Sequence, residues 1–268
     1  MAGLFSETRL PMCRKRARLA TVLAPAALAL ASLCASGGAL AADAQQRAEA
    51  RRLDPLARAA FWGSEFQANA ADAEAGVGLA QALRGLGRDD EAAEVAARAL
   101  VVHPDDPSLL LELARAHIAR GQGFYAIAPA REAASLAPKD WRPLTLLAVA
   151  YEQAQRGDEA EAAHRQALAL APSEAAPLTN YALHLAAKGD LSGAEAQLRR
   201  AVALPSAGIQ ARQNLALVVG LQGRLPEAEK LARADLPPEQ VTNNLAYLRA
   251  ALGQGGRTWE SLKAGGGR

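Results

Sequence analysis

The sequence predicts an all-α protein built as a solenoid of helix-turn-helix repeats. Pro104, Pro138 and Pro172 stand 34 residues apart, and each closes a segment rich in alanine and leucine. Alanine also recurs at three fixed places within every segment. Half of the 268 residues are apolar but only 4% are aromatic, a composition that suits closely approaching helices better than a sandwich or barrel core.

A period of 34 residues is the length of a tetratricopeptide repeat. The phase set by the prolines divides the domain at residues 73–252 into repeats at 73–106, 107–140, 141–174, 175–208 and 209–238. We therefore expect a tetratricopeptide-repeat superhelical solenoid of about five helix-turn-helix repeats with terminal capping helices. Such arrays bind other proteins through an extended inner surface.

The small residues of the repeat lie where its two helices must approach closely. They occupy positions 8, 20 and 27 of the repeat, as in Ala80, Ala92 and Ala99, and return in register in the repeats that follow. Position 15, in the turn between the two helices, is glycine in every repeat but the third, where Gln155 stands. Because glycine reaches positive φ freely, we expect an altered turn in the third repeat.

The domain is flanked by two segments that do not follow the repeat. Residues 42–72 read as an N-terminal capping helix and linker, broken early by Asp54-Pro55 and containing Phe61, Trp62 and Phe66. Aromatic residues at helical spacing predict core packing, and the alternative is an exposed docking patch around Trp62. Pro237-Pro238 end the fifth repeat, so residues 239–252 form one more helix that covers its apolar face. Residues 253–268 hold six glycines and predict a disordered tail.

Residues 1–41 read as a signal peptide for export, which places the mature chain in the periplasm. A basic cluster at 14–18 precedes the apolar stretch Leu19 to Leu33, which is short for a membrane span of about 20 residues. Cleavage after Ala41 fits the small residues Ala39 and Ala41, whereas Cys34 is a candidate for lipidation and attachment to the outer membrane. Both remain open, as does the start codon, because Met12 begins a more typical signal than Met1.

The charge of the mature chain excludes nucleic acid as a partner. The whole sequence carries a formal charge of +2, but residues 1–41 hold five of the 30 basic residues and one of the 28 acidic ones. The remainder has 25 basic and 27 acidic residues, with no basic run. It lacks the electrostatic footprint of a nucleic-acid-binding protein.

The sequence carries no motif that predicts an enzyme, a metal site or a cofactor. His103, His117, His164 and His184 fall at different repeat positions without ligand spacing, so no two are expected to converge. His164 stands at a packing position, which favours a buried neutral imidazole. With no nucleophile motif and no phosphate-binding loop, we expect a protein that is not an enzyme.

A second regularity, in the C-terminal half, predicts a peptide-binding groove. Each of three helices places a carboxamide at repeat position 6 and an apolar side chain one turn later. The groove residues are Thr179, Asn180, Leu183, Gln213, Asn214, Leu217, Asn243, Asn244 and Tyr247. Carboxamides offer donors and an acceptor, so a row of them can hold an extended peptide by its backbone. The alternative is that the asparagines serve the turn or the neighbouring helix.

The last part of the domain resembles a known family. Asp235-Leu236-Pro237-Pro238-Glu239-Gln240 followed by Asn244-Leu245-Ala246-Tyr247-Leu248-Arg249, within the segment Ala211 to Leu252, is similar to the C-terminal signature of TadD. TadD is the tetratricopeptide-repeat protein of the tight-adherence (Flp pilus) assembly and secretion system. The repeats before this segment also resemble the family, and Leu33 departs from its usual lipidation motif.

The resemblance implies an exported, non-catalytic scaffold at the inner face of the outer membrane. Such a protein helps the pilus secretin reach or assemble in that membrane, as a pilotin does, and its partners are the Flp pilus secretin or other Tad components. Two alternatives stay open: a general periplasmic scaffold of another envelope assembly, and a regulatory subunit of a peptidoglycan enzyme. The oligomeric state cannot be predicted from the sequence.

Overall fold

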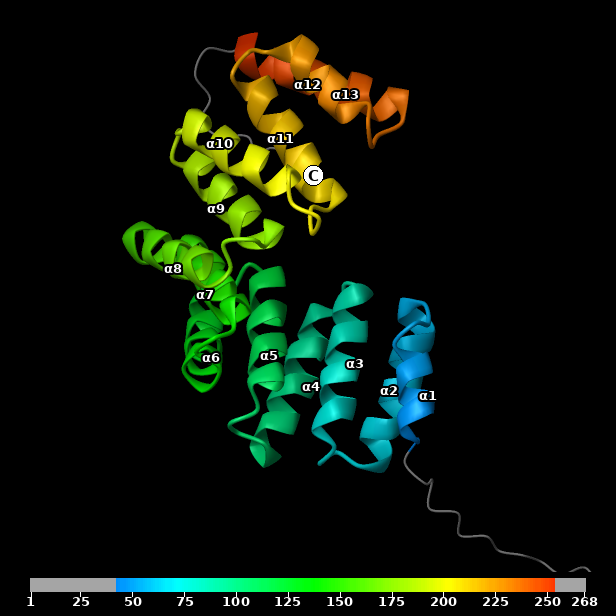
Figure 1. Cartoon of the computed structure of the whole chain (residues 1–268). Helices are drawn as coiled ribbons and strands as arrows, with labels where there is room; N and C mark the ends of the chain where they lie inside the picture. The colour runs from blue at the N-terminus through cyan, green and yellow to red at the C-terminus, as the bar shows by residue number, and fades with distance from the viewer. Residues whose placement is uncertain (1–41, 254–268) are drawn as a thin grey trace, which may run out of the picture. The chain divides into compact units, whose positions relative to one another are not determined.

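The computed structural model describes residues 42–253, which form thirteen α-helices and no strand (Figure 1). The helices are α1 (Ala44–Ala50), α2 (Pro55–Ala68), α3 (Ala73–Gly85), α4 (Asp89–Val102), α5 (Pro107–Ala119), α6 (Gly123–Leu136), α7 (Trp141–Gln153), α8 (Gly157–Leu170), α9 (Ala175–Ala187), α10 (Leu191–Val202), α11 (Ile209–Leu221), α12 (Leu225–Ala232) and α13 (Pro238–Gly253). The all-α architecture expected from the sequence is confirmed. The signal peptide at 1–41 with Cys34, and the tail from 254 onward, lie outside the described residues.

Five helix pairs follow one another, from α3–α4 to α11–α12, and each first helix also contacts the first helix of the next pair. Aspartate begins several of these first helices. The side chains of Asp72, Asp106 and Asp140 accept hydrogen bonds from backbone N–H groups in the first turns of α3, α5 and α7. Because those N–H groups have no partner within the helix, each cap stabilises its helix start by about 1 kcal/mol.

The two helices of each pair approach through alanine. Ala80, Ala92 and Ala99 in the first pair have no exposed surface, and the alanines at the same repeat positions in the later pairs are exposed by 6% at most. A larger side chain at these positions would force the helix axes apart. The core therefore consists mainly of closely packed alanine side chains, with a smaller number of large apolar side chains.

The turn between the two helices has the same backbone in all five pairs. In the first pair, Gly87 adopts φ 72°, its amide donates to the carbonyl oxygen of Arg84 at 2.9 Å, and the amide of Arg88 donates to that of Leu83 at 2.9 Å. This pattern is a Schellman C-cap, which satisfies carbonyls at the end of the first helix.

The expectation of an altered turn in the third pair was wrong. Gln155 itself adopts φ 58°, its amide donates to the carbonyl oxygen of Glu152 at 3.0 Å, and the amide of Arg156 donates to that of Tyr151 at 2.8 Å. A residue with a Cβ can enter the left-handed region at a cost of roughly 1–2 kcal/mol. The packing of the two flanking helices determines the conformation of the turn, and Gln155 adopts the positive φ that this conformation requires.

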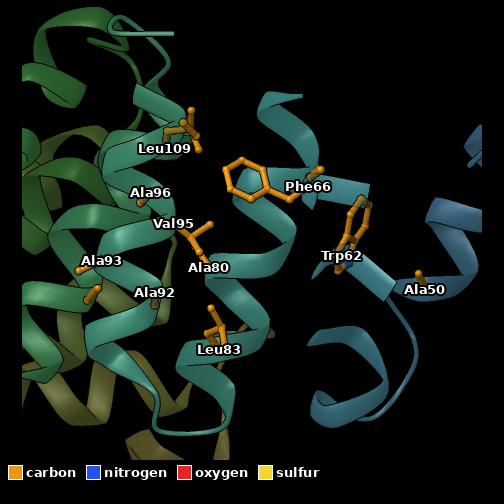
Figure 2. Close-up of a cluster of buried hydrophobic side chains, with 13 residues drawn as sticks. Ala50, Trp62, Phe66, Ala80, Leu83, Ala92, Ala93, Val95, Ala96 and Leu109 are labelled. Atoms are coloured by element: carbon orange, nitrogen blue, oxygen red, sulfur yellow. The ribbon is translucent and has the colours of Figure 1, made fainter. Parts of the chain in front are cut away.

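The N-terminal segment forms two helices, α1 and α2, separated by a break that ends at the N-cap Asp54. Trp62 and Phe66 are 2% and 3% exposed, which supports the core interpretation over a docking patch (Figure 2). The Trp62 ring lies directly on the backbone of Gly78, where an added Cβ would come within 2.4 Å of it. Repeat position 6 is glycine in the first pair because Trp62 fills the space.

Candidate functional site

The last helix, α13, covers the fifth helix pair and forms one wall of a groove. Leu248 packs on Gly220 of α11 so closely that an added Cβ there would lie 2.4 Å from Cδ1 of Leu248. The loop before α13 is fixed by Arg212, which donates to both carboxylate oxygens of Asp235 at 2.8 and 2.7 Å. These hydrogen bonds hold the pKa of Asp235 below its ordinary value.

We call the space between α11, α12 and α13 the C-terminal groove. Its volume is about 480 Å³. Its lining residues are uncharged: Gln213, Asn214, Ala216, Leu217, Ala228, Ala232, Leu236, Gln240, Val241, Asn244, Leu245, Tyr247 and Leu248. Alanine and leucine side chains give it an apolar floor, and four carboxamides supply hydrogen-bonding groups. A mostly apolar cavity with a few polar groups is typical of a ligand site.

Asn214 is the polar residue that sets this groove apart. Its side chain is 8% exposed and lines the groove, and its Nδ2 has no hydrogen-bond partner among the described residues. A buried donor without a partner costs about 1–3 kcal/mol. A bound carbonyl group that reached this nitrogen would remove that cost.

The structure brings together five of the nine residues predicted for the peptide-binding groove. Gln213, Asn214, Leu217, Asn244 and Tyr247 line the C-terminal groove. The other four do not line it, and they are Thr179, Asn180, Leu183 and Asn243.

Thr179 is buried, and its hydroxyl donates to the carbonyl oxygen of Ala175 at 2.8 Å, within its own helix. Asn180 and Leu183 are half-buried on α9, and Asn243 is exposed on α13. Sequence reasoning did not select Leu236 and Gln240, which also line the groove. Both belong to the motif Asp235 to Gln240, which the sequence identified as a helix end and a family signature and not as part of the groove.

A second cluster lies at α7, α8 and α9, and we call it the His–Glu cluster. Nε2 of His164 and Nδ1 of His184 each lie 2.9 Å from Oε1 of Glu152. The two imidazole rings are 5.1 Å apart, and the ring of Tyr181 lies 5.7 Å from His164 and 6.1 Å from His184.

The expectation that no two histidines converge was therefore wrong. The three cluster residues have different repeat positions, but α9 begins the next pair and packs against both α7 and α8. Residues of successive pairs meet there, which a comparison of equivalent positions does not reveal. A comparison of each first helix with the two helices of the preceding pair, which it contacts, could have predicted that these three residues lie close together.

Burial shapes the electrostatics of the His–Glu cluster. The side chains of His164 and His184 are 1% and 4% exposed, and that of Glu152 is 29% exposed. Burial lowers the pKa of His184 below its ordinary value, although the Glu152 charge opposes the shift. Burial raises the pKa of Glu152, but the hydrogen bonds and charges of the two histidines outweigh it and the pKa is lowered.

Comparisons with known proteins agree with the helix pairs. Residues 73–116 and 144–177 match models of the tetratricopeptide repeat. The chain is similar to the thermophilic TPR protein TTC0263 of Thermus thermophilus, with 25% identity, 65% of this chain and 97% of that chain covered, and a TM-score of 0.57.

Two further solved structures share the fold. A tetratricopeptide repeat protein from Parabacteroides merdae ATCC 43184 has 13% identity, a TM-score of 0.62, and coverage of 76% of this chain and 80% of its own. MamA from Desulfovibrio magneticus RS-1, from residue 41 to its end, has 20% identity, a TM-score of 0.52, and coverage of 60% and 91%. No match was found among curated proteins.

The helix pairs, the repeat matches and the similar structures together show a tetratricopeptide-repeat solenoid, a fold that serves as a scaffold for protein–protein interaction. Among residues 42–253, no helix is long and apolar enough to cross a membrane.

Proposed function

We propose that this tetratricopeptide-repeat protein is a non-catalytic scaffold that holds an extended segment of a partner protein in the C-terminal groove. The observation that carries the proposal is the buried Nδ2 of Asn214, which has no partner among the described residues; the residue itself lines a cavity of apolar and carboxamide side chains. A main-chain carbonyl of the partner accepts a hydrogen bond from this nitrogen, and an apolar side chain of the partner enters beside Ala216 and Ala228.

The groove selects an uncharged, apolar segment. None of its lining residues carries a charge, so an acidic or basic segment would lose hydration without gaining an ion pair. Gln213, Gln240 and Asn244 offer further carboxamides to the backbone of an extended peptide. These contacts are independent of the peptide's side chains, which suits recognition of a main chain with one or two apolar residues.

The partner that we propose is the secretin of the Flp pilus. The segment Ala211 to Leu252, which resembles TadD, is also the segment that supplies all of the groove lining. We propose that the chain is exported, acts at the inner face of the outer membrane, and shields an apolar secretin segment until the secretin assembles, in the manner of a pilotin.

Affinity for the purified secretin, measured by biolayer interferometry, tests the groove. Asn214→Leu removes the buried donor at similar volume and should weaken binding by about 3- to 10-fold, since one hydrogen bond contributes about 0.5–1.5 kcal/mol. The free energy of unfolding should not fall, because the variant removes an unsatisfied group. Asn243→Ala, the matched control, removes a neighbouring carboxamide that does not line the groove. Equal affinity of the two variants would refute the groove.

The cellular role has its own test. A strain without the chain should lose assembled secretin from its outer-membrane fraction and regain it on complementation. An unchanged secretin would refute the Flp role and direct the search for the groove's occupant to another envelope assembly or to a peptidoglycan enzyme.

A further inference from the structure

The His–Glu cluster presents three metal-ligating atoms to one point. One ligand atom each from Glu152, His164 and His184 lies within 4.8 Å of the other two. Both ring nitrogens are already directed at the same carboxylate oxygen, each at 2.9 Å. The three side chains come from three helices, so their convergence is a property of the tertiary packing.

The two distances to Glu152, 2.9 Å each, are about half an ångström shorter than the ligand spacing around a bound ion. Zn²⁺ lies about 2.0–2.1 Å from histidine nitrogen and about 2.0–2.2 Å from carboxylate oxygen, so neighbouring ligand atoms of a tetrahedral site are roughly 3.4 Å apart. To reach that spacing, Oε1 of Glu152 has to withdraw by about half an ångström from each nitrogen, and the two ring nitrogens, which lie within 4.8 Å of each other, have to come to about 3.4 Å. The side chain of Glu152 is 29% exposed and has room to move, and small rotations of the two buried imidazoles set the distance between their nitrogens.

The donor set selects the class of ion. Two imidazole nitrogens and one carboxylate oxygen favour Zn²⁺ and its late first-row neighbours, whereas Ca²⁺ and Mg²⁺ require oxygen ligands. Three protein ligands leave a fourth position for water on the side where Glu152 reaches solvent. The ring of Tyr181 lies against both imidazoles and restricts their rotation.

We propose that Glu152, His164 and His184 bind one Zn²⁺ ion. The ion would join the third helix pair to the fourth, since Glu152 and His164 lie on α7 and α8 and His184 lies on α9. The packing of α8 against α9 is sparser than that of α9 against α10. An ion that cross-links α8 to α9 would therefore stabilise the junction between the third and fourth helix pairs. The proposal does not depend on the groove or on its partner.

Titration of the purified, tag-free full chain with Zn²⁺ tests the site. Calorimetry should give one saturable ion per chain, and the melting temperature should rise with Zn²⁺ concentration, because an ion bound only by the folded state stabilises it. Co²⁺ as a second probe should give the visible absorption bands of a four- or five-coordinate nitrogen and oxygen site. Absence of saturable Zn²⁺ binding to the native chain would overturn the proposal.

The variants locate the ion. Glu152→Gln keeps a hydrogen-bond acceptor for both histidines, so the fold is retained, and it should weaken Zn²⁺ binding by more than about 10-fold. His164→Phe keeps the packing volume and should abolish the Co²⁺ bands. His103→Gln and His117→Gln are matched controls outside the cluster and should leave both signals unchanged. Native affinity in Glu152→Gln, or native Co²⁺ bands in a folded His164→Phe, would overturn the assignment.

Discussion

Replacement of Gln155 by glycine should stabilise the protein. Gln155 holds φ 58° in a turn whose four equivalents are glycines with φ between 70° and 88°. The left-handed backbone costs a residue with a Cβ roughly 1–2 kcal/mol, and the greater unfolded-state freedom of glycine offsets about 0.4–1 kcal/mol of the gain. We therefore expect Gln155→Gly to raise the free energy of unfolding by about 0.5–1 kcal/mol.

Urea unfolding followed by circular dichroism measures the effect, and a melting temperature about 1–4 °C higher should accompany it. The matched control is Gly121→Gln, which creates the strain at the equivalent turn. An added Cβ at Gly121 meets nothing within 4 Å, so the backbone conformation alone sets its cost. A less stable Gln155→Gly, or a Gly121→Gln variant as stable as the native chain, would refute the assignment of strain to this turn.

Three further predictions concern the core and its ion pairs. Glu112→Ala should destabilise the fold by about 1–3 kcal/mol in urea, and Glu112→Gln by less, because the buried carboxylate, 1% exposed, pairs with Arg84 and Arg115 at 2.9 and 2.5 Å. Ala194→Leu should cost about 1–3 kcal/mol by overpacking at a fully buried site, whereas exposed Ala196→Leu should be near neutral. Hydrogen bonds from Arg224, and from Gln222 and Arg199, lower the pKa of Glu195 from 4.5 to about 2, although burial opposes the shift. The ionised side chain therefore contributes about 1 kcal/mol, after solvent screening, to the free energy of unfolding. This contribution is present above pH 4.5 and is lost as the pH falls from 4.5 to 2. The loss of stability over that range should be shallower in Glu195→Gln.

The repeat period predicted the architecture because its signals are local. Alanine spacing, turn glycines and N-cap aspartates act within one helix pair, so the sequence specifies the helices without knowledge of their neighbours. Ala80 and Ala92 are fully buried, as a close helix approach requires. The interpretation of Trp62 as a core residue also follows from helical spacing alone.

Contacts between pairs were not predictable in the same way. Glu152, His164 and His184 converge because α9 packs against both helices of the pair before it, a contact that no single repeat specifies. Gln155 shows the reverse case, in which a local preference yields to the helices on both sides. The C-terminal groove was predictable only in part. The spacing of its carboxamides can be read from the sequence of each helix, but the position of α13 decides which of them line the same cavity.

Repeat position 6 shows how one place in the fold can serve either packing or recognition. In the first pair, Trp62 covers Gly78, and in the second, two arginines neutralise the carboxylate of Glu112. In the fifth pair, Asn214 is also buried, at 8% exposure, yet its Nδ2 meets no acceptor among the described residues. Folding alone would favour an apolar residue there, because an unsatisfied buried donor lowers stability. A donor kept at that cost, in a residue that lines an uncharged cavity, is the observation on which our proposal of carbonyl binding rests.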